Sequence, residues 1–257
     1  MRTEDVKKSV YKMLKKIKKT TKLLLHTLGF DLKRFTPDNN PFLQLRKGIE
    51  TFNIDLVLDI GANTGQFVSE LRLIGYKNRV VSFEPLSGAY KELTQQAKGD
   101  SQWLVHPQSA IGDFDGEIEI NIAGNSVSSS ILPMLESHAA AAVDSVYLAK
   151  EKVPIYRLDS IASNYLTGKE NLLIKIDTQG FEWQVLDGAK ETLQFARGVL
   201  CELSLVPLYE GGKLWLEMIE RLNSEGFTLW AIQKGFTDPR DGRTLQVDAI
   251  FFRLDEK

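Results

Sequence analysis

The segment Val57–Phe67 constrains the fold of this chain more than any other part of the sequence. Its apolar residues lead to Asp59 and Ile60, and a turn containing Gly61 and Gly65 then opens a helical pattern. Glycine adopts backbone dihedrals that other residues rarely reach, and it lets the backbone come close to a ligand. A strand, a glycine-rich turn and a helix in this order predict an open α/β sheet, in which ligands bind beyond the carboxyl ends of the strands.

Short apolar runs alternate with helical patterns from residue 54 onward, which predicts a mostly parallel sheet with helices on both faces. Seven strands are expected, at Asp55–Ile60, Arg79–Phe83, Trp103–His106, Leu172–Ile176, Val199–Glu202, Thr228–Ile232 and Val247–Arg253. Helices are expected over Phe42–Phe52, Gly65–Ile74, Ser87–Ala97, Phe181–Gln194 and Trp215–Gly226. Only a loop around Lys234–Arg243 separates the final two strands, so the last strand should be antiparallel. The predicted fold is therefore a doubly wound, seven-stranded α/β sheet.

A long insertion separates the third and fourth predicted strands. Gly112–Gly116 has the composition of a turn, and Glu117–Ile122 alternates polar with apolar residues as a half-exposed strand does. Asn125–Ser130 is rich in serine and predicts a loop. Ser137–Val146 contains four consecutive alanines and predicts either a helix or a mobile cover.

The N-terminal segment differs from the rest of the chain in charge. Residues 1–35 hold 11 Lys/Arg and three acidic residues, a net charge of +8, so the remaining residues carry −10. Apolar residues recur at helical spacing between the lysines, which predicts a basic amphipathic helix, with a break near Thr20–Thr21 as one option. Such a helix can lie on an anionic membrane, pack on the body or on a second subunit, or bind nucleic acid. We expect an extension over residues 1–45 and one domain over residues 46–257.

The composition indicates an intracellular protein. Cys201 is the one cysteine, which fits a reducing compartment. No apolar run reaches the roughly 20 residues of a membrane-spanning helix, and the N-terminus lacks the features of a signal peptide. The expected location is the cytoplasm, with peripheral contact at the inner face of the membrane as the alternative.

Glu84 strengthens the interpretation of the glycine turn as a cofactor site. It ends the second predicted strand, 23 residues after Gly61, where a carboxylate can accept two hydrogen bonds from a ribose diol. The turn has Gly-x-x-x-Gly and not Gly-x-Gly-x-x-Gly, and Asp59 before it would repel a pyrophosphate. These features favour S-adenosylmethionine, whose methionine part carries an ammonium group, over a nicotinamide cofactor. The alternative is a turn that begins a helix and binds no ligand.

A second group of polar residues should lie at the same edge of the sheet. Lys175 and Asp177 share one face of the fourth predicted strand, Glu182 begins the next helix, and Glu202 ends the fifth strand. Converging carboxylates can act as a general base or hold a divalent cation, and the structural alternative is an ion pair of Lys175 with Asp177 or Glu182. His138 in the insertion is another candidate base.

Several of these segments together resemble the FkbM family of methyltransferases. The similarity covers residues 54–253 and is carried by Asp59–Phe67, Phe83–Pro85, Ala110–Asp113, Lys175–Glu182 and Val247–Phe252. Many members have Val-Glu where this chain has Thr178 and Gln179, so one carboxylate is missing. The resemblance implies the Rossmann-like, seven-stranded methyltransferase fold, an S-adenosylmethionine cofactor with S-adenosylhomocysteine as product, and O-methylation of sugars or secondary metabolites.

The resemblance also assigns the residues around the cofactor. Those expected to flank its methionine end are Asp59, Gly61, Asn63 and Gly65. Glu84 is expected to bind the ribose. Those expected near the adenine are Ser109, Ala110 and Ile111.

The expected function is methylation of a hydroxyl on a glycan or another sugar-containing small molecule, with Asp177 as proton acceptor assisted by Lys175 and Glu202. Ser126–Tyr147 and Leu205–Gly212 should shape the acceptor pocket. A secondary-metabolite acceptor is the first alternative, and a cofactor-binding scaffold without catalysis is the second. The charge of −10 on the body would repel phosphates, which argues against a nucleic-acid substrate.

Overall fold

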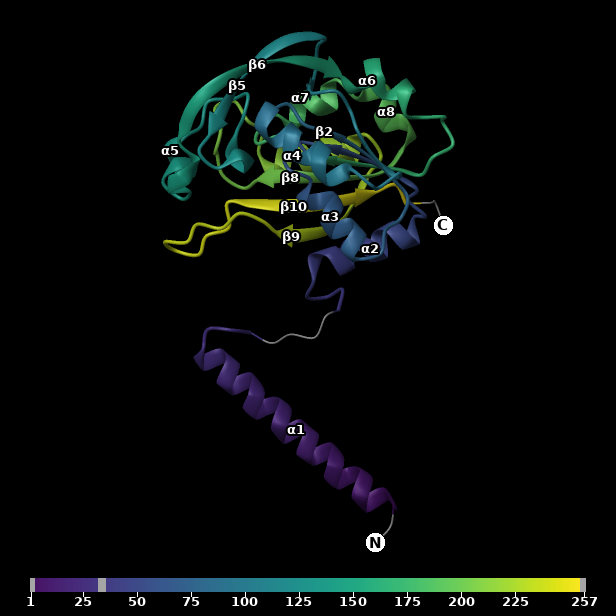
Figure 1. Cartoon of the computed structure of the whole chain (residues 1–257), viewed down its shortest axis with the longest axis vertical. Coiled ribbons are helices and arrows are strands. Elements are labelled where there is room, and N and C mark those ends of the chain that lie inside the picture. Colours follow the sequence, from purple (N-terminus) through teal and green to yellow (C-terminus); the bar gives the residue numbers. More distant parts are fainter. Residues whose placement is uncertain (1–2, 32–35, 255–257) are drawn as a thin grey trace. The chain divides into compact units, whose positions relative to one another are not determined.

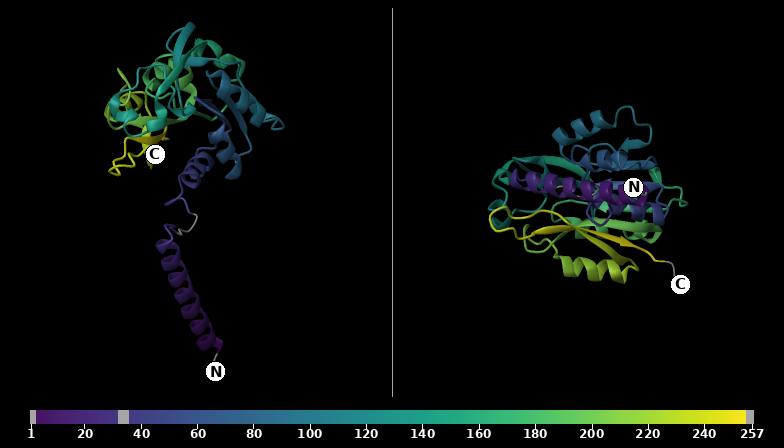
Figure 2. Two further views of the ribbon diagram at one scale, coloured as in Figure 1. Left: turned by 60° about the vertical axis from the view of Figure 1, so that its left-hand side comes forward. Right: turned by 90° about the horizontal axis from the view of Figure 1, so that it is seen from below.

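The computed structural model of the chain describes residues 3–31 and 36–254, in two units, Met1–Gln44 and Leu45–Lys257. The first unit contains α1 (Thr3–Thr27), which Figures 1 and 2 show as one unbroken helix. The break considered at Thr20–Thr21 is absent, since α1 runs through both residues, and the Thr20 hydroxyl donates to the carbonyl of Lys16 within the helix. The side chains of residues 3–10, and the basic residues Lys33 and Arg34, lie outside the description.

Helix α2 (Pro41–Thr51) corresponds to the helix expected over Phe42–Phe52 and lies one residue earlier at each end. The Asn40 side chain accepts a hydrogen bond of 2.9 Å from the backbone N–H of Leu43, and the fixed φ of Pro41 suits the first helical position. Leu45 and Ile49 are buried in the second unit. The helix therefore starts at a cap and then packs on the body.

The seven-stranded sheet of the second unit confirms the predicted fold. Its strands follow the order β3-β2-β1-β7-β8-β10-β9. Their bounds are Leu56–Ile60 (β1), Arg79–Phe83 (β2), Trp103–Val105 (β3), Leu172–Ile176 (β7), Ala196–Ser204 (β8), Thr228–Lys234 (β9) and Gln246–Phe252 (β10). The pairs from β3 to β8 are parallel, and β10 is antiparallel to both β8 and β9.

Helices cover both faces of this sheet, as the two views in Figure 2 show. Those on one face are α7 (Glu182–Asp187), α8 (Lys190–Phe195) and α9 (Trp215–Ser224), whose buried residues form one core with alternate residues of β1 and β7. The other face carries α2, α3 (Gln66–Leu73) and α4 (Ser87–Ala97). There Gly48 of α2 lies against Phe252 of β10.

The single helix predicted over Phe181–Gln194 is wrong, because the structure has α7 and α8 with an interruption at Gly188 and Ala189. A Cβ atom added at Gly188 would lie 1.8 Å from the carbonyl oxygen of Gly112. The chain therefore bends where another backbone segment passes too close for any side chain.

The insertion forms a second sheet of three strands, in the order β4-β6-β5. Its strands are β4 (Ala110–Gly112), β5 (Gly116–Ala123) and β6 (Tyr147–Arg157). The strand predicted at Glu117–Ile122 lies within β5, whereas β4 and β6 were not predicted. The region Ser137–Val146 holds part of α5 (Glu136–Ala139) and a 3-10 turn (Val143–Ser145) instead of a long helix.

Two short elements, α6 (Leu158–Ile161) and the 3-10 turn Ala162–Asn164, lead back to the main sheet. None of the helices in the described ranges is both long enough and apolar enough to cross a membrane.

Candidate active site

The strand register brings Asp59, Ser82 and Lys175 together. Asp59 of β1 lies opposite Ser82 of β2 and Lys175 of β7. Parallel neighbours in register point to the same face of the sheet. Asp59 has no exposed surface, and one carboxylate oxygen lies 3.2 Å from Lys175 Nζ while the other accepts a 3.0 Å hydrogen bond from Ser82. Asp59 is therefore inaccessible to a ligand in this structure, and its negative charge is paired with Lys175.

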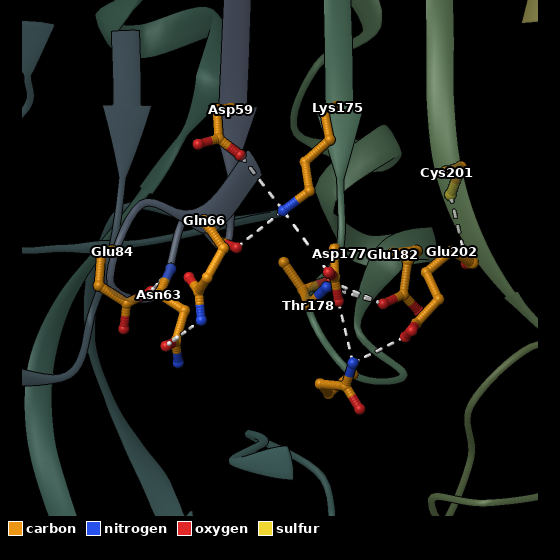
Figure 3. A network of polar contacts seen from close by, with 12 residues as sticks. Asp59, Asn63, Gln66, Glu84, Lys175, Asp177, Thr178, Glu182, Cys201 and Glu202 are labelled. Atoms are coloured by element: carbon orange, nitrogen blue, oxygen red, sulfur yellow. Dashed lines mark hydrogen bonds and ion pairs between the residues drawn. The ribbon is translucent and has the colours of Figure 1, made fainter. Parts of the chain in front are cut away.

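Lys175 joins the end of β7 to the turn after β1 (Figure 3). Its Nζ atom lies 3.5 Å from Asp177 Oδ2 and donates a 2.8 Å hydrogen bond to the carbonyl of Gly61. Burial lowers the pKa of Lys175, but the two carboxylates outweigh burial and raise that pKa above its ordinary value. The lysine is therefore a fixed positive charge between Asp59 and Asp177, and not a base. The predicted ion pair with Asp177 is present.

The glycines of the turn are required by contacts inside the protein. Gly61 has a φ of 75°, and a Cβ atom there would lie 1.8 Å from the carbonyl oxygen of Asp177. Gly65 has a φ of 95°, and its Cβ would lie 2.7 Å from the Trp103 ring. The glycines were expected to let a ligand come close to the turn. In the structure, both glycines instead make room for another part of the chain.

The backbone N–H groups of the turn are all used within the protein. Those of Gly61 and Ala62 donate to the carbonyl of Phe83, and that of Gly65 donates to Ala62. The N–H of Asn63 donates to Glu84. The N–H of Thr64 donates to the Asn63 side chain. A phosphate-binding turn presents free N–H groups to its ligand, so this turn is unsuited to a pyrophosphate.

Glu84 lies directly beyond β2, against the turn. Its two carboxylate oxygens accept hydrogen bonds of 2.7 Å from the N–H of Asn63 and 2.9 Å from the N–H of Leu86. Burial raises the pKa of Glu84 to about 7, although both hydrogen bonds lower it. Each oxygen has a second lone pair left, which suits a pair of adjacent hydroxyls.

An acidic cluster occupies the neighbouring ends of β7, β8 and β10, and we define it as Asp177, Glu202 and Asp248. Asp248 lies directly opposite Glu202 in the antiparallel pair of β8 and β10. The Gln179 side-chain amide donates to both Asp177 (2.9 Å) and Glu202 (2.7 Å), and Gln246 donates to Glu202 at 2.6 Å. Amide hydrogens therefore offset the repulsion between carboxylates that converge in one place.

Burial and mutual repulsion both act on this acidic cluster. Burial, followed by the charges of Asp177 and Glu182, raises the pKa of Glu202 well above its usual range. Burial and then Asp177 raise the pKa of Asp248 to about 6, against an opposing effect of Lys175. The Asp177 side chain is 35% exposed, so a substrate can reach its carboxylate.

Glu182 hydrogen-bonds to the backbone and does not pair with Lys175. Its buried carboxylate accepts hydrogen bonds from the N–H groups of Thr178 and Gly180, and burial raises its pKa. The ion pair considered between Lys175 and Glu182 is not formed. Glu182 instead shapes the turn that presents Gln179, whose φ of 54° is unusual for a residue other than glycine.

The serine-rich loop of the insertion covers the space between the glycine turn and the acidic cluster. The Asn63 side-chain amide donates to the Ser126 hydroxyl at 3.1 Å, and the Ser130 hydroxyl donates to the carbonyl of Gln179 at 2.6 Å. Tyr209 contacts this loop and the cluster at once, because its hydroxyl lies 3.3 Å from the carbonyl of Ser128 and 2.8 Å from Gln179 Oε1.

His138 lies behind Tyr209. Its ring is 2% exposed, packs at a centroid distance of 5.2 Å from the rings of both Tyr209 and Phe236, and hydrogen-bonds to Ser145. Burial lowers the pKa of His138. The structure thus brings Lys175, Asp177 and Glu202 together and leaves His138 in a separate apolar cluster.

The family model for the methyltransferase FkbM domain matches residues 59–229, which is well over half of the chain. The chain belongs to the FkbM methyltransferase family. It is therefore an S-adenosylmethionine-dependent methyltransferase, and S-adenosylmethionine is its cofactor.

The chain is similar in structure to several solved proteins with which it shares little sequence identity. One is a protein from Klebsiella pneumoniae described as an O-methyltransferase, with 10% identity, a TM-score of 0.49, and coverage of 90% of this chain and 86% of that one. Another is the magnesium protoporphyrin IX methyltransferase of Synechocystis PCC 6803, with 10% identity, a TM-score of 0.44 and coverage of 88% and 87%. A third is an rRNA methylase from Streptococcus thermophilus, with 11% identity, a TM-score of 0.45 and coverage of 84% and 98%. No curated protein matches the sequence.

The geometry of this FkbM methyltransferase fits its cofactor. The turn withholds its N–H groups from phosphate, while Glu84 keeps lone pairs for a ribose diol. Ser109, Ala110 and Ile111, assigned to the adenine by resemblance, lie at the start of the second sheet with buried side chains, and the Ser109 hydroxyl donates to Pro107. Their role at the adenine stays a prediction. In the described ranges, no three His, Cys, Asp or Glu side chains are grouped so as to hold a metal ion.

Three residues of the site were not predicted as site residues, namely Gln179, Gln246 and Asp248, and Tyr209 was predicted only as part of the segment Leu205–Gly212. Asp248 was quoted only for its family resemblance, and its place opposite Glu202 depends on the register of an antiparallel pair. Gln179 was noted only as a departure from the family pattern. A clue existed there, because a polar residue two positions after Asp177 stays near the same edge of the sheet.

Proposed function

We propose that this FkbM methyltransferase methylates a hydroxyl group of a glycan or of another sugar-containing small molecule. The observation that carries the proposal is the acidic cluster, with the Gln179 amide, beside the cofactor turn. Carboxylates and amides are the groups that hydrogen-bond neighbouring hydroxyls, and the partly exposed Asp177 can also accept a proton.

In the proposed reaction the protein mainly orients the acceptor. S-adenosylmethionine, when bound, supplies a methyl group on a positively charged sulfur. The acceptor oxygen bonds to the methyl carbon as the carbon–sulfur bond breaks, and the electron pair of that bond remains on the sulfur of S-adenosylhomocysteine. The hydroxyl proton passes to the Asp177 carboxylate.

Lys175 and Glu202 position this carboxylate. Lys175 holds one Asp177 oxygen by its charge, and Gln179, itself bonded to Glu202, donates to the other. Both oxygens are thus fixed in direction, while lone pairs remain for the acceptor. His138 ranks below Asp177 as the base, because its ring is buried between Tyr209 and Phe236.

Cofactor recognition falls to the groups around the turn. Glu84 binds the ribose hydroxyls, and the turn from Asp59 to Gly65 lies at the methionine end. Glu84→Ala is expected to weaken S-adenosylhomocysteine binding roughly 100-fold, since two hydrogen bonds to a charged group are lost. Titration calorimetry measures this, with NAD as the control ligand and Glu92→Ala, an exposed carboxylate of α4, as the control variant.

The acceptor is tested with isotopically labelled S-adenosylmethionine and a panel of oligosaccharides, glycosylated metabolites and aglycones, read by mass spectrometry. Asp177→Asn is expected to lower turnover about 10²- to 10⁴-fold with unchanged S-adenosylhomocysteine affinity. Glu220→Gln on the exposed face of α9 is the charge-matched control.

Two results would redirect the proposal. Methylation of aglycones alone would favour a secondary-metabolite acceptor. Firm binding of S-adenosylhomocysteine without methylation of any hydroxyl compound would favour the scaffold alternative.

A further inference from the structure

Helix α1 presents a continuous apolar face. Met13, Leu14, Ile17 and Leu24 recur at the three- and four-residue spacing that places them on one side of a helix. Their exposed fractions are 56%, 49%, 52% and 62%. Leu28, directly after the helix, continues the same side and is 65% exposed. This face lies outside any core of the described chain.

Two hydroxyl groups on this side of α1 are satisfied within the helix. The Thr20 hydroxyl donates to Lys16, and that of Thr27 donates to Leu24. Gly29, two residues after the helix, has a φ of 81°, and the N–H of Phe30 then donates to the carbonyl of Leu25. These bonds cap the carboxyl end and turn the chain at an exposed aromatic residue. The Thr20 and Thr27 hydroxyls therefore keep their hydrogen bonds when an apolar surface covers this face.

The opposite side and both flanks of α1 are basic. The exposed lysines from residue 11 onward are Lys12, Lys15, Lys16, Lys18, Lys19 and Lys22. The one acidic residue in the described stretch 11–31 is Asp31, which pairs with Lys22 and with His26. Each copy of α1 carries eight lysines and only two carboxylates, Glu4 and Asp5, so two copies together would hold a large excess of positive charge and the charges favour an anionic partner.

We propose that α1 binds flat on the surface of an anionic lipid bilayer. The apolar face enters the boundary between headgroups and acyl chains, and the flanking lysines contact lipid phosphates and carboxylates. Residues 36–257 carry a net charge of −10, so repulsion from the same surface leaves the N-terminal segment as the point of attachment. This proposal is independent of the methyl acceptor.

The test is flotation of the full-length protein with phosphatidylcholine vesicles, with and without phosphatidylglycerol. Binding is expected only with the anionic lipid and should weaken with added salt. The variant Lys12→Gln/Lys15→Gln/Lys19→Gln should bind about 100-fold more weakly, roughly fivefold for each lysine. The control Lys77→Gln/Lys91→Gln/Lys98→Gln makes the same charge change at exposed positions of the body and should bind as the wild type does.

A second variant, Leu14→Gln/Ile17→Gln/Leu24→Gln, keeps every charge and should also lose binding. Sedimentation velocity of the wild type should give a monomer at the same concentrations. The proposal is overturned if anionic vesicles fail to bind the wild type, or if both triple lysine variants bind equally well. It is also overturned if α1 instead mediates a dimer or retention on RNA without vesicle binding.

Discussion

Asp248 reaches the acidic cluster from the one strand of the main sheet that runs against its neighbours. It faces Glu202 across the β8–β10 pair, and burial and Asp177 raise its pKa to about 6. A carboxyl group whose pKa is raised by folding stabilises the protein while it is protonated. That contribution is complete below the unfolded-state pKa of about 3.9 and is lost as the pH rises through the folded-state value.

Asp248→Asn should therefore raise the free energy of unfolding by on the order of 1 kcal/mol at about pH 8 and change it little at about pH 4. Urea denaturation at the two pH values measures the difference. Asp144→Asn, at an exposed position of the insertion, is the control and should show no such pH dependence. Equal destabilisation by Asp248→Asn at both pH values would mean that its hydrogen bonds matter more than its charge.

Single residues near the first strands were predictable because sequence position there fixes spatial position. Asp59, Glu84 and Lys175 each end or nearly end a parallel strand, and parallel strands end at one edge. The contact of Asp59 with Lys175 needed the register of β1 on β7, and the sequence assigned the Asp59 charge to a ligand instead. The Gln179 amide bridges Asp177 and Glu202 from a residue with a left-handed backbone conformation, and no sequence pattern predicts that conformation.

Among the elements, the turn after β1 is held most tightly by the protein itself. Its Gly61 leaves no room for a side chain against the Asp177 carbonyl, at 1.8 Å. The turn, β7 and Lys175 therefore form one rigid unit, and the distance between cofactor turn and acidic cluster depends on it.

Gly61→Ala should lower the free energy of unfolding by roughly 3 kcal/mol or more, because a positive φ and a backbone clash act together. Gly75→Ala is the matched control: its φ is 92° and its added Cβ would meet nothing within 4 Å. It should cost about 1 kcal/mol, from the dihedral alone. Denaturant titration of both variants isolates the effect of the clash, and equal losses would contradict it.

Helices and strands were predictable where the hydrophobic pattern of the sequence was strong. They were not predictable where contacts with other parts of the chain determine the structure. The strands of the main sheet are continuous buried apolar runs. Strand β6 buries only Val153 and Ile155, carries several charges and contains Pro154, so nothing in its sequence indicated a strand. The bend at Gly188 depends on the carbonyl of Gly112, 76 residues earlier in the chain.

The whole molecule consists of a structured body and an N-terminal unit of opposite charge. The division falls between Gln44 and Leu45, beside the predicted boundary at residue 45, and both lie inside α2. Asn40 caps α2, so an N-terminal deletion that leaves the body intact must end before Asn40.

Deleting residues 1–35 should leave the free energy of unfolding of the body unchanged within about 0.5 kcal/mol, as for changes at sites that bury nothing. Denaturation followed by tryptophan fluorescence measures it, because all four tryptophans lie beyond residue 35. A loss of several times that size would show that α1 packs on the body, which was one of the alternatives to membrane contact.

The position of β10 between β8 and β9 has a consequence for the order of events during synthesis. Domains fold as the chain emerges, and pairings between distant segments form late. While residues 246–252 are still inside the ribosome, β8 is the exposed edge of the nascent sheet and Glu202 has neither Gln246 nor Asp248 beside it. The β9–β10 hairpin must then dock as a pair. The residues predicted to bind the cofactor all precede β9 and β10 in the chain, so they can reach their places before the acidic cluster is complete.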